Sequence, residues 1–383
     1  MSGWLAARRV LLPEGPLRAA AVRVEGHVIA EVVDGEPPPG AVAEVLPDGV
    51  VLVPGLVDLQ VNGYAGADLQ SGDVTSVRSA ARALALDGVS AFAGTVVTAP
   101  VELMRAAVDA LVAVHHDPRP GEARVVAVHL EGPFLAPDAR GVHPVEHLRP
   151  PDDALAGALL PPSGVPAVVT LAPELPGALD LVRRLVARGV RVSLGHSRAG
   201  ADVARAAVDA GARLVTHLWN AQSGVVNRDP GVAALALTDP RVVAGLIADL
   251  VHVDPVTLAL SWAAAPGRLA LVTDATAASS AQDPSAATHR LGPAHLVRGA
   301  DGVPRDAAGR LAGSALRLDA AIGNVIAVTG DAEGALRAAT SVPADALGVP
   351  AGRLRAGARA DLTLLAADGG RCVGAWLGGS RLP

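Results

Sequence analysis

Eight short apolar runs recur along the middle of the chain and restrict its fold more than any other feature. The segments between them carry apolar residues at helical spacing and often close on glycine, a common residue at helix C-termini. Buried strands that alternate with helices are typical of a parallel sheet covered by helices, and eight such units make a (β/α)8 barrel. The runs are VPGLVDLQVNG, VSAFAGTVV, VVAVHLEG, AVVTLAPE, VRVSLGHS, RLVTHLWN, VVAGLIADLV and LALVTDAT.

The two ends of the chain differ from this middle part. Residues 1–53 and 345–383 contain short strand-like runs separated by glycine and proline turns. We predict that both ends join in one small β-sandwich domain and that residues 54–344 form the α/β barrel of TIM type. Residues 277–310 are polar with little periodicity, so we expect a loop near the site, either a lid or a poorly ordered insertion.

Composition excludes several classes of protein. All 32 basic residues are arginine, so the chain has no Schiff-base lysine, no phosphate-binding P-loop lysine and no metal-bridging carbamylated lysine. A net charge of -6 disfavours nucleic acid as the main partner. The single Cys372 excludes an intrachain disulfide and fits a reducing compartment. Without a signal-peptide pattern or a run of about 18 apolar residues, we expect a cytoplasmic protein with no membrane span.

Three residues of types that bind metals stand where three of the predicted strands end. Glu131 closes VVAVHLEG, His196 closes VRVSLGHS, and His217 lies near the end of RLVTHLWN. Because parallel barrel strands end at one rim, we expect the three side chains to converge. Alone, each histidine is more simply a hydrogen-bonded structural residue, and the glutamate a helix cap. Together they are a catalytic ligand set for one divalent ion with a position left for water, zinc first, with iron or manganese as alternatives.

A fourth candidate, Asp274, ends the last apolar run in LVTDAT. A carboxylate there faces the predicted ligands across the barrel mouth. Such a group can take a proton from water and later return it to the leaving atom. The alternative interpretation is an aspartate that caps the following segment.

The order of seven motifs resembles that of the N-acetylglucosamine-6-phosphate deacetylases in the amidohydrolase superfamily. The resemblance implies hydrolysis of N-acetyl-D-glucosamine 6-phosphate to D-glucosamine 6-phosphate and acetate, in amino-sugar catabolism or cell-wall recycling, by a homodimer. It makes Asp274 the general base and then the general acid, and it places His143 against the scissile carbonyl. It assigns substrate contacts to Asn220, Ala221, His252, Ala312 and Gly313, and the phosphate to Arg228, often across a dimer. The motifs are PGLVDLQVNG, HLEGPFL, GHSRA, THLWNAQS, VHVDP, LVTDAT and LAGSAL.

Two departures from the wider superfamily stand out. Gln60 and Asn62 replace the usual H-x-H pair of the first strand, and neutral amides are poor zinc ligands, so we expect one metal ion and not two. Gln222 replaces the methionine usual after Asn-Ala, near the expected phosphate site. The alternatives are an amidohydrolase for another N-acyl amino sugar or a cyclic amide, or a non-catalytic barrel that binds sugar phosphates. The remaining histidines considered match no catalytic position: His115, His116, His129, His147, His289 and His295.

Overall fold

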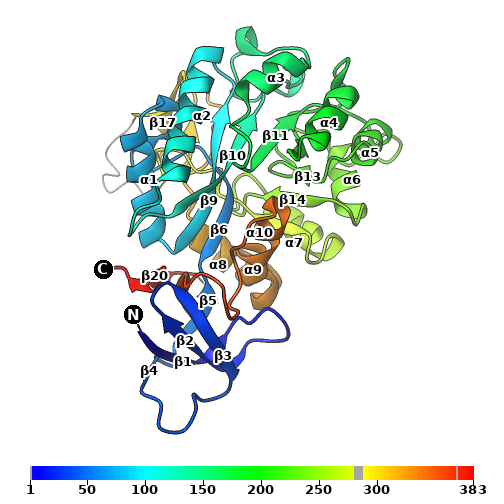
Figure 1. Cartoon of the computed structure of the whole chain (residues 1–383). Helices are drawn as coiled ribbons and strands as arrows, with labels where there is room; N and C mark the ends of the chain where they lie inside the picture. The colour runs from blue at the N-terminus through cyan, green and yellow to red at the C-terminus, as the bar shows by residue number, and fades with distance from the viewer. Residues whose placement is uncertain (1, 280–287, 368–369) are drawn as a thin grey trace.

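The centre of the molecule is a ring of eight parallel strands, seen in a computed structural model that describes residues 2–279, 288–367 and 370–383 (Figure 1). Each of the eight predicted runs overlaps one of these strands, and a helix follows each, which confirms the (β/α)8 fold class. The strands are β6 (Leu56–Val61), β9 (Val89–Val97), β10 (Arg124–Glu131), β11 (Ala167–Leu171), β12 (Arg191–Leu194), β13 (Leu214–Val215), β14 (Val243–Leu246) and β15 (Leu269–Leu271).

The ring closes between its first and last strands. A parallel bridge joins Val61 to Ala275, and the Asp274 N–H donates to the Gln60 carbonyl over 3.0 Å. Closure therefore sets the end of β6 beside the end of β15, two segments far apart in the sequence. All nine residues of β9 are buried, as expected for a parallel strand covered on both faces.

The helices surround the ring (Figure 1). In α1, the buried residues Val77, Ala80, Ala81 and Leu84 form one apolar stripe, while the Asp73 side chain caps the first turn through the Thr75 N–H. The helices are α1 (Val74–Leu86), α2 (Val101–His116), α3 (Asp153–Leu159), α4 (Ala178–Ala187), α5 (Ala201–Asp209), α6 (Val232–Thr238), α7 (Pro255–Ala264), α8 (Leu318–Thr329), α9 (Ala332–Ala338) and α10 (Ser341–Leu347).

The two ends of the chain build a second eight-stranded sheet, below the barrel in Figure 1. Strand β19 pairs antiparallel with β5, and Arg381 near the C-terminus lies 3.5 Å from Glu44. The expected boundary at residue 345 falls inside α10, which contacts the barrel strands β6 and β15. The strands of this sheet are β1 (Ser2–Val10), β2 (Arg18–Glu25), β3 (Val28–Asp34), β4 (Ala43–Val45), β5 (Val50–Pro54), β19 (Leu362–Ala366), β20 (Cys372–Leu377) and β21 (Ser380–Arg381).

The segment expected as a loop over 277–310 differs from that prediction. Its described part folds into an antiparallel three-stranded sheet of β16 (Thr288–Leu291), β17 (Ala294–Arg298) and β18 (Pro304–Arg305). Residues 280–287 of the segment lie outside the described residues. The sheet was hidden from pattern analysis because only Leu291, Leu296 and Val303 are buried apolar residues there, too few to give a clear alternation.

Short elements complete the fold. Among the described helices, none is long and apolar enough to cross a membrane. The short elements are β7 (Gly63–Tyr64), β8 (Ala67–Asp68) and the 3-10 turns η1 (Leu69–Ser71), η2 (Pro137–Ala139) and η3 (Val145–His147).

Candidate active site

The three predicted metal ligands converge at the carboxyl end of the barrel. His196 Nε2 and His217 Nε2 lie 3.1 Å and 2.8 Å from the same carboxylate oxygen, Oε1 of Glu131. The two Nε2 atoms lie 3.1 Å apart. All three side chains are buried, at 4–6% exposure. Three ligand atoms that crowd one point, each from a different strand end, match the donor set and spacing that a divalent ion needs.

Charge and hydrogen bonding keep Glu131 ionised and orient the His196 ring, and both effects favour binding of a cation. Burial opposes ionisation of Glu131, yet the two imidazoles hold the pKa of this carboxyl well below its ordinary value. Burial also lowers the pKa of His217, but the hydrogen bond and charge of Glu131 outweigh it and raise the pKa to about 9. The second nitrogen of His196, Nδ1, lies 2.8 Å from the Ala139 carbonyl and donates to it, so Nε2 is left with a free lone pair.

Backbone strain collects at the same strand ends. His196, His217 and Asp274 have φ angles of 48°, 29° and 50°, in the left-handed region that favours glycine. Each such residue costs about 1–3 kcal/mol and persists where the surrounding structure holds it, often at functional sites. The positive φ angles therefore fall just beyond the strands, at residues that line the cavity.

A further histidine, His143, also borders the cluster. Ligand atoms of Glu131, His143 and His196 lie within 4.8 Å of one another, so these three form an alternative metal set. However, the Thr98 backbone N–H donates to His143 Nδ1 over 3.3 Å, which places the ring proton on Nε2. Burial lowers the pKa of His143 to about 3, so the ring is neutral near pH 7 and presents an N–H donor. We therefore favour His217 as the third ligand.

Asp274 lies beside the cluster and is held by the first-strand amides. Its Oδ1 accepts hydrogen bonds from Asn62 Nδ2 at 2.7 Å and Gln60 Nε2 at 3.0 Å. The same Gln60 amide lies 3.3 Å from both oxygens of Glu131. Burial, and then the negative charge of Glu131, raises the pKa of Asp274 to about 6. The two amides thus present N–H donors to the carboxylates, where ligands for a second cation would present lone pairs.

These side chains open into one cavity of about 300 Å³. Asn220, Ala221 and His252 line it together with the catalytic candidates, as does Gly313. A side chain at Gly313 would lie 2.8 Å from the Asp274 carbonyl and 2.5 Å from Thr276, and its φ is +56°, so this position requires glycine.

Two predicted contacts lie elsewhere. Ala312 packs in a small apolar cluster with Val97 and Leu296, and its N–H is already donated to the Pro304 carbonyl. Arg228 is exposed in the loop after β13 and is not part of the cavity lining. Within the described part of the chain it makes no hydrogen bond or ion pair.

Several residues of this site were not predicted from the sequence, Thr98, Leu291 and Asp249 among them. Thr98 sets the proton of His143, Leu291 from the small sheet lines the cavity, and Asp249 binds the His252 ring at 2.7 Å. Only Asp249 left a signal, since an aspartate three residues before a histidine in a turn is a common hydrogen-bonding spacing. The other two contacts join segments distant in sequence.

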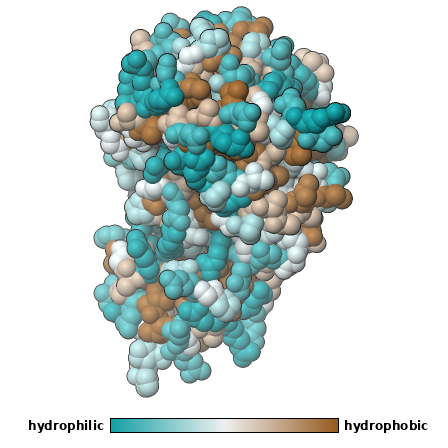
Figure 2. Space-filling view, turned by 90° about the vertical axis from the view of Figure 1, so that its right-hand side faces the viewer, coloured by the Kyte–Doolittle hydropathy of each residue, from teal (hydrophilic) through white to brown (hydrophobic). Residues whose placement is uncertain are grey.

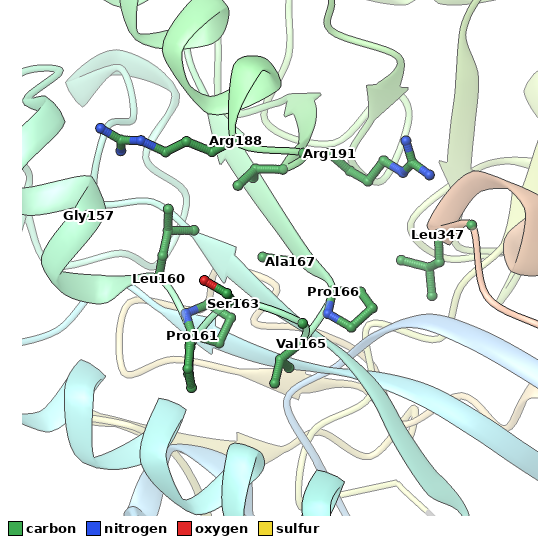
Figure 3. A pocket seen from close by; sticks show the side chains of 15 residues that line it. Gly157, Leu160, Pro161, Ser163, Val165, Pro166, Ala167, Arg188, Arg191 and Leu347 are labelled. Atoms are coloured by element: carbon green, nitrogen blue, oxygen red, sulfur yellow. The ribbon is translucent and has the colours of Figure 1, made fainter.

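A larger hollow of about 560 Å³ lies at the opposite end of the barrel, at the starts of β11 and β12 (Figure 3). Its lining includes two arginines but no histidine, cysteine or carboxylate. Arg188 is paired with Asp153 at 2.8 Å, and Arg191 lies against Gly348 at the end of α10. This hollow therefore has no metal-binding chemistry, and the smaller cavity is the candidate active site.

An eight-stranded barrel with a buried carboxylate and two imidazoles at its carboxyl rim has the fold and donor set of a metal-dependent hydrolase. The sequence model of the amidohydrolase family matches residues 51–379, and the chain belongs to this family.

Within that family, the similarity is to one group of deacetylases. The chain is 38% identical over 370 residues to N-acetylgalactosamine-6-phosphate deacetylase of Escherichia coli O157:H7, covering 95% of both chains. It is 39% identical over 334 residues to N-acetylglucosamine-6-phosphate deacetylase of Bos taurus, covering 83% of this chain and 80% of the relative.

Solved structures point to the same group. An N-acetyl-D-glucosamine-6-phosphate deacetylase from Mycobacterium smegmatis superposes with a TM-score of 0.93 at 32% identity, over 99% of both chains. That structure is an aspartate-to-alanine mutant in complex with N-acetyl-D-glucosamine-6-phosphate. The deacetylase of Thermotoga maritima gives a TM-score of 0.86 at 27% identity, over 97% of both chains.

Proposed function

We propose that this chain hydrolyses the N-acetyl group of N-acetyl-D-glucosamine 6-phosphate, giving D-glucosamine 6-phosphate and acetate, as a cytoplasmic enzyme of amino-sugar metabolism. The observation that carries the proposal is the convergence of Asp274, His143 and the three ligand residues on one cavity. The similarity to deacetylases over nearly the whole chain supports the same reaction.

Glu131, His196 and His217 would hold one divalent ion. Two imidazoles and a carboxylate suit zinc, iron and manganese alike, and zinc is the ion we propose to test first. When bound, such an ion polarises a carbonyl group and lowers the pKa of water. The amide donors of Gln60 and Asn62 support a single ion, since they stabilise the neighbouring carboxylates without offering lone pairs to a second one.

Asp274 takes the proton of the attacking water and later delivers it to the sugar nitrogen as the C–N bond breaks. Its Oδ1 is engaged by Gln60 and Asn62, which leaves Oδ2 for proton transfer. A pKa of about 6 suits a group that must first accept and then return a proton near neutral pH.

His143 donates its Nε2–H to the acetyl oxygen as negative charge develops there. Thr98 holds the ring in this tautomer, so the donor is in place before the reaction begins. Asn220, Ala221, His252 and Gly313 would contact the sugar from the cavity wall.

No arginine is among the described residues that line the cavity, so the same chain supplies no guanidinium for the phosphate there. Arg228 carries a guanidinium suited to a phosphate dianion but lies outside the cavity of its own chain. We propose a homodimer in which Arg228 enters the cavity of the second copy. The adjacent Val225 and Val226 are 58% and 55% exposed, and Val256 on α7 is 78% exposed. Figure 2 faces the α4–α7 side of the barrel and shows apolar residues gathered among polar ones. Exposed apolar side chains beside Arg228, which has no partner among the described residues, support an interface there.

Acetate release separates the possible substrates. The metal-loaded protein would be assayed on N-acetyl-D-glucosamine 6-phosphate, its galactosamine epimer and unphosphorylated N-acetyl-D-glucosamine. We expect the first to have the highest kcat/KM and the unphosphorylated sugar to be at least about 100-fold poorer, as for loss of a charge-assisted contact.

Arg228→Ala should remove most of this phosphate preference by raising KM, whereas Arg205→Ala, an exposed arginine paired with Asp202, should not. If the galactosamine epimer has the higher kcat/KM, it replaces the glucosamine compound as the proposed substrate. Equal hydrolysis of phosphorylated and unphosphorylated sugar would refute phosphate recognition. Metal-loaded protein that binds the sugar phosphate without releasing acetate would instead identify a sensor.

A further inference from the structure

We infer that Asp249 is a positioning residue for His252, holding the ring so that Nε2 meets a hydroxyl group of the sugar. The inference rests on the proposed function, because it takes the cavity lined by His252 as the substrate site.

The Asp249 carboxylate makes three hydrogen bonds within one turn. Its Oδ2 lies 2.7 Å from His252 Nδ1. Its Oδ1 accepts from the backbone N–H groups of Val251 at 2.9 Å and His252 at 2.8 Å. The aspartate and histidine side chains are only 12% and 5% exposed. The contact between them is therefore buried and shielded from competing water.

The turn is strained, and the strain lies between the two partners. Leu250 has a φ of 64°, in the left-handed region that residues other than glycine rarely adopt. On the side of the turn that leads from β14, Asn324 on α8 donates to the Ala248 carbonyl over 2.8 Å. A strained residue persists where neighbours hold it, and here the three bonds of Asp249 are the interactions that do so.

The chemistry of the pair determines what His252 offers to the cavity. An ionised carboxylate only accepts hydrogen bonds, so the ring must carry a proton on Nδ1. The neutral ring then has its lone pair on Nε2, which has no partner within the described part of the chain. A sugar hydroxyl can donate to this lone pair. The other interpretation is that Asp249 merely shapes the turn through its two backbone bonds.

Asp249→Asn separates these interpretations. The asparagine Oδ1 still accepts from both backbone N–H groups, so the turn is kept. Its NH2 group replaces the accepting Oδ2 and favours an unprotonated Nδ1, which moves the ring proton to Nε2. Asp254→Asn is the matched control, because Asp254 makes the same kind of cap bond, to the Val256 N–H at 2.8 Å, without a histidine partner.

The experiment combines kinetics with histidine NMR on the metal-loaded, full-length protein. We expect kcat/KM of Asp249→Asn to fall about 10- to 100-fold, mostly through KM, with metal content and Tm unchanged. Asp254→Asn should stay within about threefold of wild type. In a His252→Ala background, Asp249→Asn should cause little further loss, because its effect passes through the missing ring.

Nitrogen-15 spectra of labelled histidines, assigned by the His252→Ala variant, test the tautomer without relying on activity. We expect an Nδ1–H ring in the wild type and a proton shifted to Nε2 in Asp249→Asn. A wild-type His252 protonated on Nε2 alone overturns the inference. So does an Asp249→Asn protein with wild-type kcat/KM, or one whose loss is equally large without His252. If wild-type protein releases no acetate, the proposed function fails, while the spectra still decide the tautomer.

Discussion

The replacement Asp274→Asn tests the proposed reaction most directly, because the structure isolates one function of this side chain. The amide oxygen of an asparagine can keep the two hydrogen bonds now made by Oδ1 to Gln60 and Asn62. The other oxygen, Oδ2, becomes an NH2 group that cannot accept a proton from water. The fold and the ligand cluster should therefore survive while proton transfer is lost.

The expected loss of kcat follows from the acid–base role of Asp274. A positioned general acid–base contributes about 100- to 10,000-fold to the rate, and each factor of ten is about 1.4 kcal/mol of activation free energy. We therefore expect kcat to fall by that factor, equivalent to about 3–5 kcal/mol. KM should change far less, since the lost interaction belongs to the transition state.

The assay is acetate release at saturating N-acetyl-D-glucosamine 6-phosphate, with bound metal measured on the same samples. Asp58→Asn is a matched control, because Asp58 is a buried carboxyl bonded to the neighbouring Thr273 but absent from the cavity lining. It should keep kcat within about threefold of wild type. An Asp274→Asn protein that holds metal and retains more than about a tenth of the wild-type kcat would refute the acid–base role.

Three further predictions concern protons. As the pH is lowered, kcat/KM should begin to fall at or below about pH 6, because Asp274 must be ionised to accept a proton and its pKa is raised to about 6. A fall that begins above about pH 7 would contradict this role. Binding of zinc to metal-free protein near pH 7 should release about one proton, because His217 has a pKa of about 9 and must lose its proton to bind the ion. Calorimetry in buffers of different ionisation enthalpy would measure the number of protons released. Zero release would exclude an imidazolium in the cluster. Burial raises the pKa of Asp58 from 3.8 to about 7, so its contribution to stability is complete below the unfolded value and is lost as pH rises through about 7. The fall in Tm between about pH 5 and pH 8 should accordingly be smaller in Asp58→Asn, and an unchanged fall would show that this carboxyl is already ionised.

Much of the barrel was predictable because its signal is local. Burial of a strand or a helix gives a pattern of apolar residues within a short stretch of sequence. The eight apolar runs and the helical spacing between them are such patterns. Glu131, His196 and His217 could be named for a related reason, since parallel strands must all end at the same rim. The small sheet over residues 288–305 was missed because its few buried side chains left no such pattern.

What only the tertiary structure decided are contacts between distant segments and the turns that aim side chains. Closure of the ring brings Gln60 and Asn62 to Asp274, more than 200 residues away, and turns a pair that looked like lost metal ligands into donors for a carboxylate. The proton of His143 is set by a backbone N–H on another strand end. Such contacts depend on how the ring closes and on strained backbone angles, and neither leaves a pattern in neighbouring residues. The sequence by itself therefore determined which elements form and which ligands gather, while the folded chain decided where the protons lie.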